Sequence, residues 1–422
     1  MMIFTSVYTV VDGFFVSNFA GEVAFKAVNL IMPFLMIVAT VGFMFGAGGT
    51  AIVAATYGEG DRERANRYFS LFVYLTFGIG LLIGILGFIF VRPVAILLGA
   101  EGEILENCVV YGRVILAITP FAVLQFLFQS FFIAAEKPRL GLLVIVAAGV
   151  TNMVLDATLV TLLPQQYKLL GAAIATGMSM VIGGGLPLIY FFRKNGSLFR
   201  LGRTKFEIRP ILKAAGNGSS EFMSNVSMSI VGMLYNLQLL KYAGDDGIAA
   251  YGVMMYISMI FSAVFVGYSI GVAPIVSYNY GAANHEEKRG VLRKSLLIIA
   301  LVSAAMLIAS ELFASPLSSI FVGYNAELLE MTVRGMRIFS LCYMLMGFAI
   351  FASSFFTALN DGLTSAIISF LRTFVFQLAA VLLLPLVFGG VDGIWWSVVA
   401  ADFMAVLLSG IFLIVKRKRF KY

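Results

Sequence analysis

Apolar runs long enough to cross a membrane recur along the whole chain. Each is about 20 residues or longer, which is the length of a helix that spans the hydrocarbon core of a bilayer. Because the runs are continuous, they indicate helices rather than the alternating strands of a membrane barrel. The pattern predicts an all-α polytopic membrane protein with twelve spans, over residues 1–20, 28–56, 67–91, 108–135, 140–163, 171–192, 215–242, 248–279, 293–313, 331–358, 363–388 and 391–415.

Composition excludes an ordinary soluble protein. Hydrophobic residues make up 60% of the 422 positions and charged residues only 12%, whereas a soluble domain carries about 25% charged residues. The net charge of +7 does not indicate a nucleic-acid partner, because the basic residues fall in the short loops between apolar runs. Cys108 and Cys342 are far apart and have no metal or redox spacing, so we interpret them as packing residues.

The loop charges predict an orientation. Alternate loops and the C-terminal tail hold 21 of the 29 Lys and Arg residues, while the opposite set of loops holds seven. The positive-inside rule places the basic set in the cytoplasm. We therefore expect a multi-pass protein of the inner or plasma membrane with both termini cytoplasmic.

The second half of the chain repeats the first. Corresponding positions stand 223 or 224 residues apart: Tyr57 and Tyr280, Pro93 and Pro316, Phe131 and Phe355. Six spans per half is an even number, so both halves enter the membrane in the same direction, as in transporters built from parallel repeats. The predicted organisation is two pseudo-symmetric six-helix lobes, 1–192 and 215–415, with a basic cytoplasmic linker at 193–214 and a basic tail at 416–422.

Two carboxylates interrupt the apolar runs of the first half. Asp12 lies in the first predicted span and Asp156 in the fifth, where Asn152 is one helical turn earlier on the same face. A charge at membrane depth costs at least about 3 kcal/mol, so it is retained when it is paired, protonated or bound to a cation. Tyr8, on the face of Asp12, and Thr176, in the sixth span, could add hydroxyl groups.

The repeat provides an internal comparison for these residues. The corresponding positions of the second half are Asn236, Phe376, Ala380 and Val398. If the polar groups served only to stabilise a six-helix lobe, both lobes would need them. Their loss from the second half favours a functional site confined to the first.

These elements resemble the multidrug and toxic compound extrusion (MATE) transporters. The resemblance rests on Tyr8-x-x-x-Asp12-Gly, the Tyr-Gly turn before a charged loop, Asn152-x-x-x-Asp156 and Gly171-Ala-Ala-Ile-Ala-Thr176, and it covers nearly the whole chain. It is closest to the branch of the DNA-damage-inducible protein F type and bacterial multidrug exporters. It implies a cation site at Asp12, Asn152, Asp156 and Thr176, with Tyr8 beside it.

The function implied is secondary-active antiport, in which organic and often cationic compounds are exported in exchange for H⁺ or Na⁺. We expect small-molecule substrates, membrane lipid as the environment, a monomer, no nucleic-acid partner and no cofactor beyond the coupling ion. Asp12, Asn152, Asp156 and Thr176 would serve as metal ligands only if the ion is Na⁺, and the sequence leaves H⁺ and Na⁺ open.

Three further charged residues belong to the second half. Another branch of the family uses carboxylates there, and the expected ones are not obvious in this chain. Glu221, near the cytoplasmic start of the seventh predicted span, is a secondary candidate. Arg372 and Asp402 lie at similar depths in the last two spans, and we interpret them as a structural ion pair.

Two other functions stay open at this stage. A flippase for lipid-linked oligosaccharides could share the two-lobe design, but its cavity should be basic, and nearly all Lys and Arg here lie in loops. A membrane-embedded enzyme would need a catalytic constellation such as HExxH or a nucleophile with its base, and the helices carry none.

Overall fold

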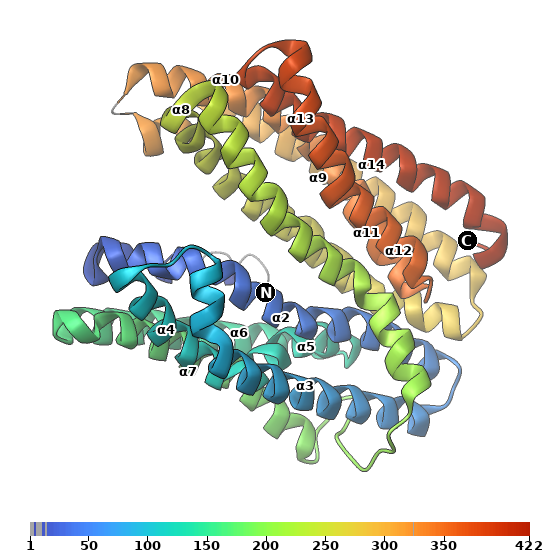
Figure 1. The fold of residues 1–422 in the computed structure, drawn as a ribbon. Coiled ribbons are helices and arrows are strands. Elements are labelled where there is room, and N and C mark those ends of the chain that lie inside the picture. Colours follow the sequence, from blue (N-terminus) through green and yellow to red (C-terminus); the bar gives the residue numbers. More distant parts are fainter. Residues whose placement is uncertain (1–3, 6–10, 13–14, 324) are drawn as a thin grey trace. The chain divides into compact units, whose positions relative to one another are not determined.

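The computed structural model describes Phe4, Thr5, Val11, Asp12 and residues 15–323 and 325–422, and this part of the chain consists of helices joined by loops, without a strand (Figure 1). It divides into two compact units, residues 1–218 and 219–422. Each unit has its own hydrophobic core of buried aromatic and aliphatic side chains. The boundary lies inside a single long helix, so the predicted linker 193–214 belongs to the first unit.

The first unit carries the N-terminal half of the predicted spans. Its elements are η1 (Val16–Ala20), α2 (Glu22–Gly58), α3 (Arg62–Leu97), α4 (Gly102–Ala117), α5 (Thr119–Ala134), α6 (Pro138–Leu155), η2 (Asp156–Val160), η3 (Gln165–Tyr167), α7 (Lys168–Phe192) and the start of α8 (Ile208–Gly281). Asp61 begins α3 by accepting a hydrogen bond from the Arg64 N–H, as an N-cap residue does.

The second unit is built from the rest of α8 and the helices that follow it. These are α9 (His285–Val322), α10 (Ala326–Ser340), α11 (Tyr343–Ala358), α12 (Gly362–Phe370), η4 (Leu371–Phe376), α13 (Gln377–Phe388) and α14 (Val391–Phe420). Asn284 begins α9, where its side chain accepts a hydrogen bond from the Glu287 N–H. Asn284 stands 223 residues after Asp61, so the two N-caps occupy corresponding positions of the repeat.

The helices account for the predicted spans. Among the described residues eight helices are long and apolar enough to cross a membrane, and the bent pairs α4 with α5 and α10 with α11 add two more when each pair is counted as one span. The 74 residues of α8 would reach about 110 Å as one straight helix, which is over three times the hydrocarbon thickness. Gly244, at φ 62°, breaks it into two spans. The described helices thus supply eleven of the twelve predicted spans, and the first predicted span, residues 1–20, lies largely outside the described residues.

The two halves share their irregularities. The fourth span bends by 60° between α4 and α5, and its counterpart bends by 46° between α10 and α11. The fifth span contains the π-helical turn η2, and its counterpart contains the π-helical turn η4. π-Helical turns insert an extra residue into an α-helix and are frequent at functional sites. They mark the depth at which Asp156 and Arg372 stand.

The segment after α7 packs on the first unit and is not a free tether. Phe199 is buried, and its ring stacks on Phe69 of α3 with centroids 5.6 Å apart. The next backbone N–H, that of Arg200, donates to Asn66 Oδ1 at 2.9 Å. These contacts explain why the linker forms part of the compact first unit.

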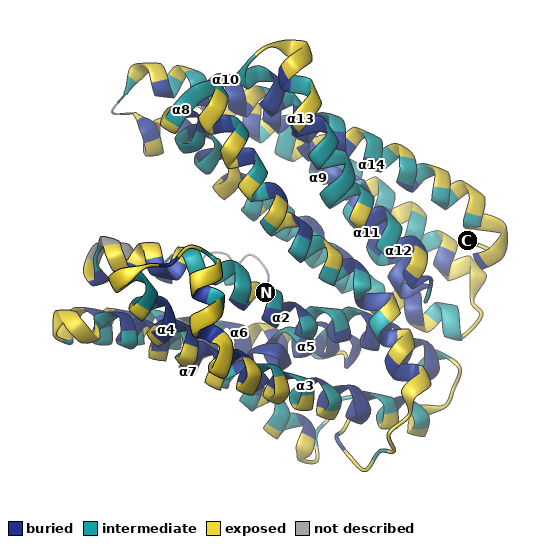
Figure 2. Ribbon diagram, in the orientation of Figure 1, coloured by how far each residue is buried: buried dark blue, intermediate teal, exposed yellow. Residues whose placement is uncertain are grey.

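The outer faces of the helices are apolar. Along α3, Leu82, Ile85 and Ile89 are each more than half exposed and follow one another at helical spacing, whereas Phe69 and Phe72 are fully buried. Figure 2 shows the same recurrence of exposed positions along α3. A surface of this kind suits lipid, since hydrocarbon tails are as apolar as leucine.

Close helix packing requires a glycine at position 184, within the glycine run at residues 183–185. A Cβ added to Gly184 of α7 would clash with the backbone of Phe121 in α5, whereas a Cβ on Gly185 would be 3.8 Å from the Phe121 ring, an ordinary contact. Gly184→Ala is therefore expected to destabilise the protein by about 1–3 kcal/mol, as overpacking does. Gly185→Ala is the matched control, and thermal unfolding of the detergent-solubilised protein is the measurement. Equal melting temperatures for the two variants would refute this close contact.

Candidate functional site

The candidate site is centred on the π-helical turn of the fifth span. α6 ends at Leu155, and the backbone N–H of Asp156 bonds to the carbonyl oxygens of both Asn152 and Met153. The widened turn η2 begins at Asp156. The side chains of Asn152 and Asp156 are buried, at 1% and 0% exposure. A carboxylate and an amide are thus both enclosed where the helix changes its winding.

Two other elements bring polar groups to this turn. Asp12 of the first span is 7% exposed, and its Oδ1 accepts a hydrogen bond of 3.2 Å from the Thr176 hydroxyl of α7. Asp12 also interacts with the side chains of Asp156 and Asn152. The structure therefore brings together four of the five residues that the sequence singled out. The fifth, Tyr8, lies outside the described residues.

Several polar atoms of the site lack ordinary partners. In the described part of the chain, neither oxygen of Asp156 and neither polar atom of the Asn152 amide has a hydrogen bond of normal length. Asp12 and Asp156 also make no ion pair there with Lys, Arg or His. Buried polar atoms without partners cost about 1–3 kcal/mol each. The site therefore has capacity for a proton or a cation that would satisfy these atoms.

Two neighbouring carboxylates set the electrostatics. Like charges close to one another disfavour ionisation of both groups, and a proton or a cation between them removes this repulsion. The surrounding oxygens come from carboxylate, amide and hydroxyl groups, which are the ligands that hard cations prefer. Among the residues that the structure describes, no three His, Cys, Asp or Glu side chains gather as a metal-binding group.

Tyr111 of α4 is a member of the site that the sequence did not reveal. Its side chain is 1% exposed, and its hydroxyl, which has no hydrogen bond within the described residues, is influenced electrostatically by both Asp12 and Asp156. Its hydroxyl can donate to a carboxylate or accept from a bound group. As one of 17 tyrosines in an apolar chain, Tyr111 carries no pattern that would separate it from lipid-facing or core residues.

The corresponding region of the second unit is chemically different. Asn236 is exposed, and Ala380 and Val398 are buried apolar residues. The neighbouring Tyr235 hydroxyl donates to Gln377 Oε1 at 2.6 Å and lies 2.8 Å from Ser397 Oγ. The polar atoms in this region satisfy one another, in contrast to those around Asp156.

The charged residues singled out in the second half form their own group. Arg372 Nε in η4 lies 3.1 Å from Asp402 Oδ1 in α14, with side chains 18% and 3% exposed. Glu221 of α8 is half-buried and interacts electrostatically with Arg372. The buried charge of Asp402 is thus compensated by Arg372 within the membrane-spanning part of the second unit.

Solved structures with the same fold are transporters. One described as the outward-facing conformation of a multidrug resistance MATE family transporter of the MOP superfamily has a TM-score of 0.93, with 23% sequence identity, and the match covers 100% of this chain and 94% of that chain. A crystal structure of MATE in complex with MaL6 gives 0.92 at 22% identity, covering 100% and 95%. This likeness establishes the fold.

Curated relatives match over nearly their full length. The multidrug export protein MepA of Staphylococcus saprophyticus is 23% identical over an alignment of 422 positions, which covers 98% of this chain and 90% of the relative. MepA of Staphylococcus haemolyticus is 24% identical over 407 residues, 96% and 88% of the two chains. The MatE family model matches residues 1–158 and 222–382, which is more than half of the sequence and falls in both repeats. The chain is therefore a multi-pass membrane protein that belongs to the MatE family.

Proposed function

We propose that this protein is a secondary-active exporter of organic, often cationic compounds, driven by the inward flow of H⁺ or Na⁺ through a site in the first unit. The observation that carries the proposal is the pairing of Asp12 with Asp156, buried beside amide and hydroxyl groups whose polar atoms are not all satisfied. The names of the relatives, multidrug export proteins, support the substrate class.

The chemistry of the pair gives a coupling mechanism. With both carboxylates ionised, Asp12 and Asp156 repel one another. A proton shared between them, or a Na⁺ held by their oxygens with Asn152 and Thr176, removes that repulsion and draws the first and fifth spans together. Release of the ion restores the repulsion between the two carboxylates. Binding of the ion thus changes the relative stability of two arrangements, which is the requirement for a ligand-driven conformational equilibrium.

The remaining assignments follow from loop charge. We propose that the protein lies in the inner or plasma membrane, functions as a monomer, and has its basic loops and both termini in the cytoplasm. The end of the first unit where α2, α4 and α7 begin then faces outward, because the basic loops join the opposite ends of these helices. The protein itself carries out no covalent chemistry in this proposal.

The test is export of ethidium from vesicles that contain the purified protein. A pH gradient and a Na⁺ gradient are imposed separately, and an ionophore that dissipates each gradient is the control. We expect one of the two gradients to drive ethidium transport, and that gradient identifies the coupling ion. Absence of transport under both gradients would refute the proposed function.

A further inference from the structure

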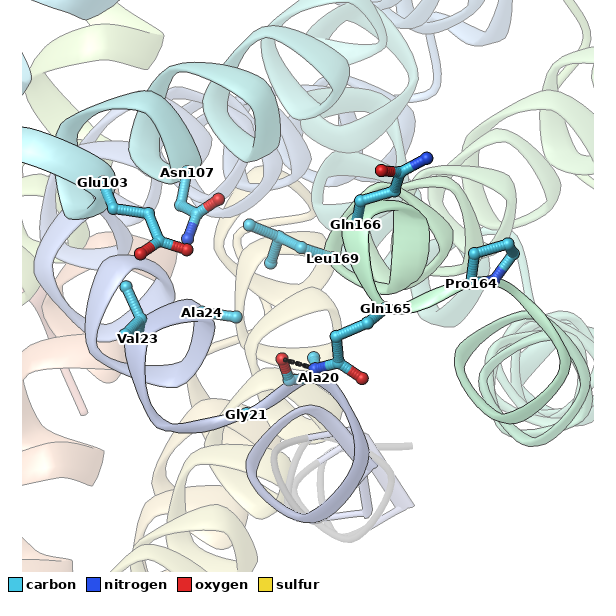
Figure 3. A pocket seen from close by; sticks show the side chains of 10 residues that line it. All are labelled: Ala20, Gly21, Val23, Ala24, Glu103, Asn107, Pro164, Gln165, Gln166 and Leu169. Carbon is cyan, nitrogen blue, oxygen red and sulfur yellow. Dashed lines mark hydrogen bonds between the residues drawn. The ribbon is translucent and has the colours of Figure 1, made fainter.

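A cavity of about 730 Å³ lies at one end of the first unit, where α2, α4 and α7 begin. Its polar lining comes from Glu103 and Asn107 of α4 and from Gln165 and Gln166 in the turn before α7. Figure 3 shows the Glu103 and Asn107 side chains next to one another, one helical turn apart, with the two glutamines on another side of the cavity.

The charge of this lining is negative. Among the lining residues whose side chains the structure describes, the exposed Glu103 is the one charged residue, and no Lys or Arg accompanies it. Within the described ranges Glu103 forms no ion pair, whereas Glu106, one turn further along α4, binds Arg92 at 2.6 Å. The Glu103 carboxylate and the amide oxygens beside it are therefore able to bind a cation.

The cavity is built on the same elements as the carboxylate site. Ala20 lies eight residues after Asp12 in the first span, and Leu169 lies seven residues before Thr176 in α7. At the rise of an α-helix, the seven residues along α7 place Thr176, and with it the site, roughly 10 Å deeper than the cavity. Pro164, at the cavity, is eight residues after Asp156, so the fifth span gives a similar depth.

A hydrogen bond connects the cavity to the first span. The side-chain N–H of Gln165 donates to the Ala20 carbonyl oxygen at 2.9 Å (Figure 3). Ala20 is the last residue of η1, and Gly21 turns the chain there with a φ of 99°. The end of the span that carries Asp12 thus forms part of the cavity wall.

We propose that this cavity is an outer binding site for a hydrated monovalent cation, hydronium or Na⁺, from which the coupling ion reaches Asp12 and Asp156. The inference rests on the proposed function. Glu103 supplies the charge, and Asn107, Gln165 and Gln166 bind the water of hydration. The volume suits a hydrated ion, because a water molecule occupies about 30 Å³ in the liquid.

The first test measures ion dependence of ethidium transport in vesicles, with the coupling ion varied on the side of the cavity. Glu103→Gln should raise the ion concentration for half-maximal transport about threefold or more and leave the maximal rate unchanged. Gln166→Glu, which adds a carboxylate, should lower that concentration. Glu101→Gln is the matched control, since Glu101 is an exposed glutamate of the same turn that does not line the cavity.

A second test does not depend on transport. In protein carrying Asp156→Asn, which disables the deeper site, broadening of the ²³Na NMR line should fall by half or more when Glu103→Gln is added, but not when Glu101→Gln is added. Equal broadening in all three proteins would overturn the inference, as would an unchanged half-maximal concentration in Glu103→Gln. Failure of the proposed function is distinct, because the wild-type protein itself would then show no gradient-driven transport.

Discussion

Replacing Asp156 by asparagine is expected to abolish gradient-driven export while the protein still folds and inserts. Asparagine has nearly the same shape, but it can neither take up a proton nor balance the charge of a bound cation. Losing one partner of a buried charge interaction costs about 2–5 kcal/mol, and 3 kcal/mol corresponds to roughly 150-fold in binding. We expect ethidium transport to fall by about that factor or more under the driving gradient.

Stability should change in the opposite direction to activity. Asp156 is fully buried, and its carboxylate oxygens have no ordinary hydrogen bond within the described residues. An ionisable group at membrane depth raises the free energy of the folded protein. Its removal should therefore leave the melting temperature of Asp156→Asn equal to or above that of the wild type. A group that is kept despite lowering stability is typical of a functional site.

Asp246→Asn provides the control for this experiment. Asp246 is an exposed aspartate beside the Gly244 break in α8, so the same substitution there should change neither export nor melting temperature. Undiminished export by Asp156→Asn would refute the coupling mechanism. A lower melting temperature with export retained would show instead that Asp156 is a structural residue.

The hydrophobic pattern was sufficient to predict an all-helical membrane protein and where its long apolar helices lie. The break in α8 falls at Gly244, between the predicted spans 215–242 and 248–279, because an apolar run must end where the chain leaves the membrane. The bend before α5 also has a local signal, Pro120, in the first turn of that helix. These features depend on residues near one another in the chain.

Features that depend on tertiary contacts were not predictable. The bend between α10 and α11, at Leu341 and Cys342, contains no proline or glycine. No residue type signals the π-helical turns η2 and η4 in the sequence. Each turn contains one extra residue, and the packing around the helix stabilises it. Tyr111 joins the site because α4 packs there, and the cavity at Glu103 forms from three helix starts that are remote in sequence.

The second large expected effect is a loss of stability when the ion pair of Arg372 and Asp402 in the second unit is broken. Arg372→Met should lower the free energy of unfolding by about 3–5 kcal/mol, because it leaves a buried carboxylate without its partner. Asp402→Leu should be less damaging, since Arg372 still interacts with Glu221. Melting temperatures of the purified variants in one detergent provide the comparison.

The double variant Arg372→Met/Asp402→Leu separates a structural pair from a transport role. Replacing a whole buried ion pair by apolar residues of similar volume is often neutral or stabilising, so its melting temperature should return toward that of the wild type. The residual loss should come from Glu221, which then lacks the charge of Arg372. If the pair is structural, export by the double variant recovers together with stability. If stability returns and export does not, Arg372 and Asp402 participate in transport, and coupling would then extend beyond the carboxylates of the first unit.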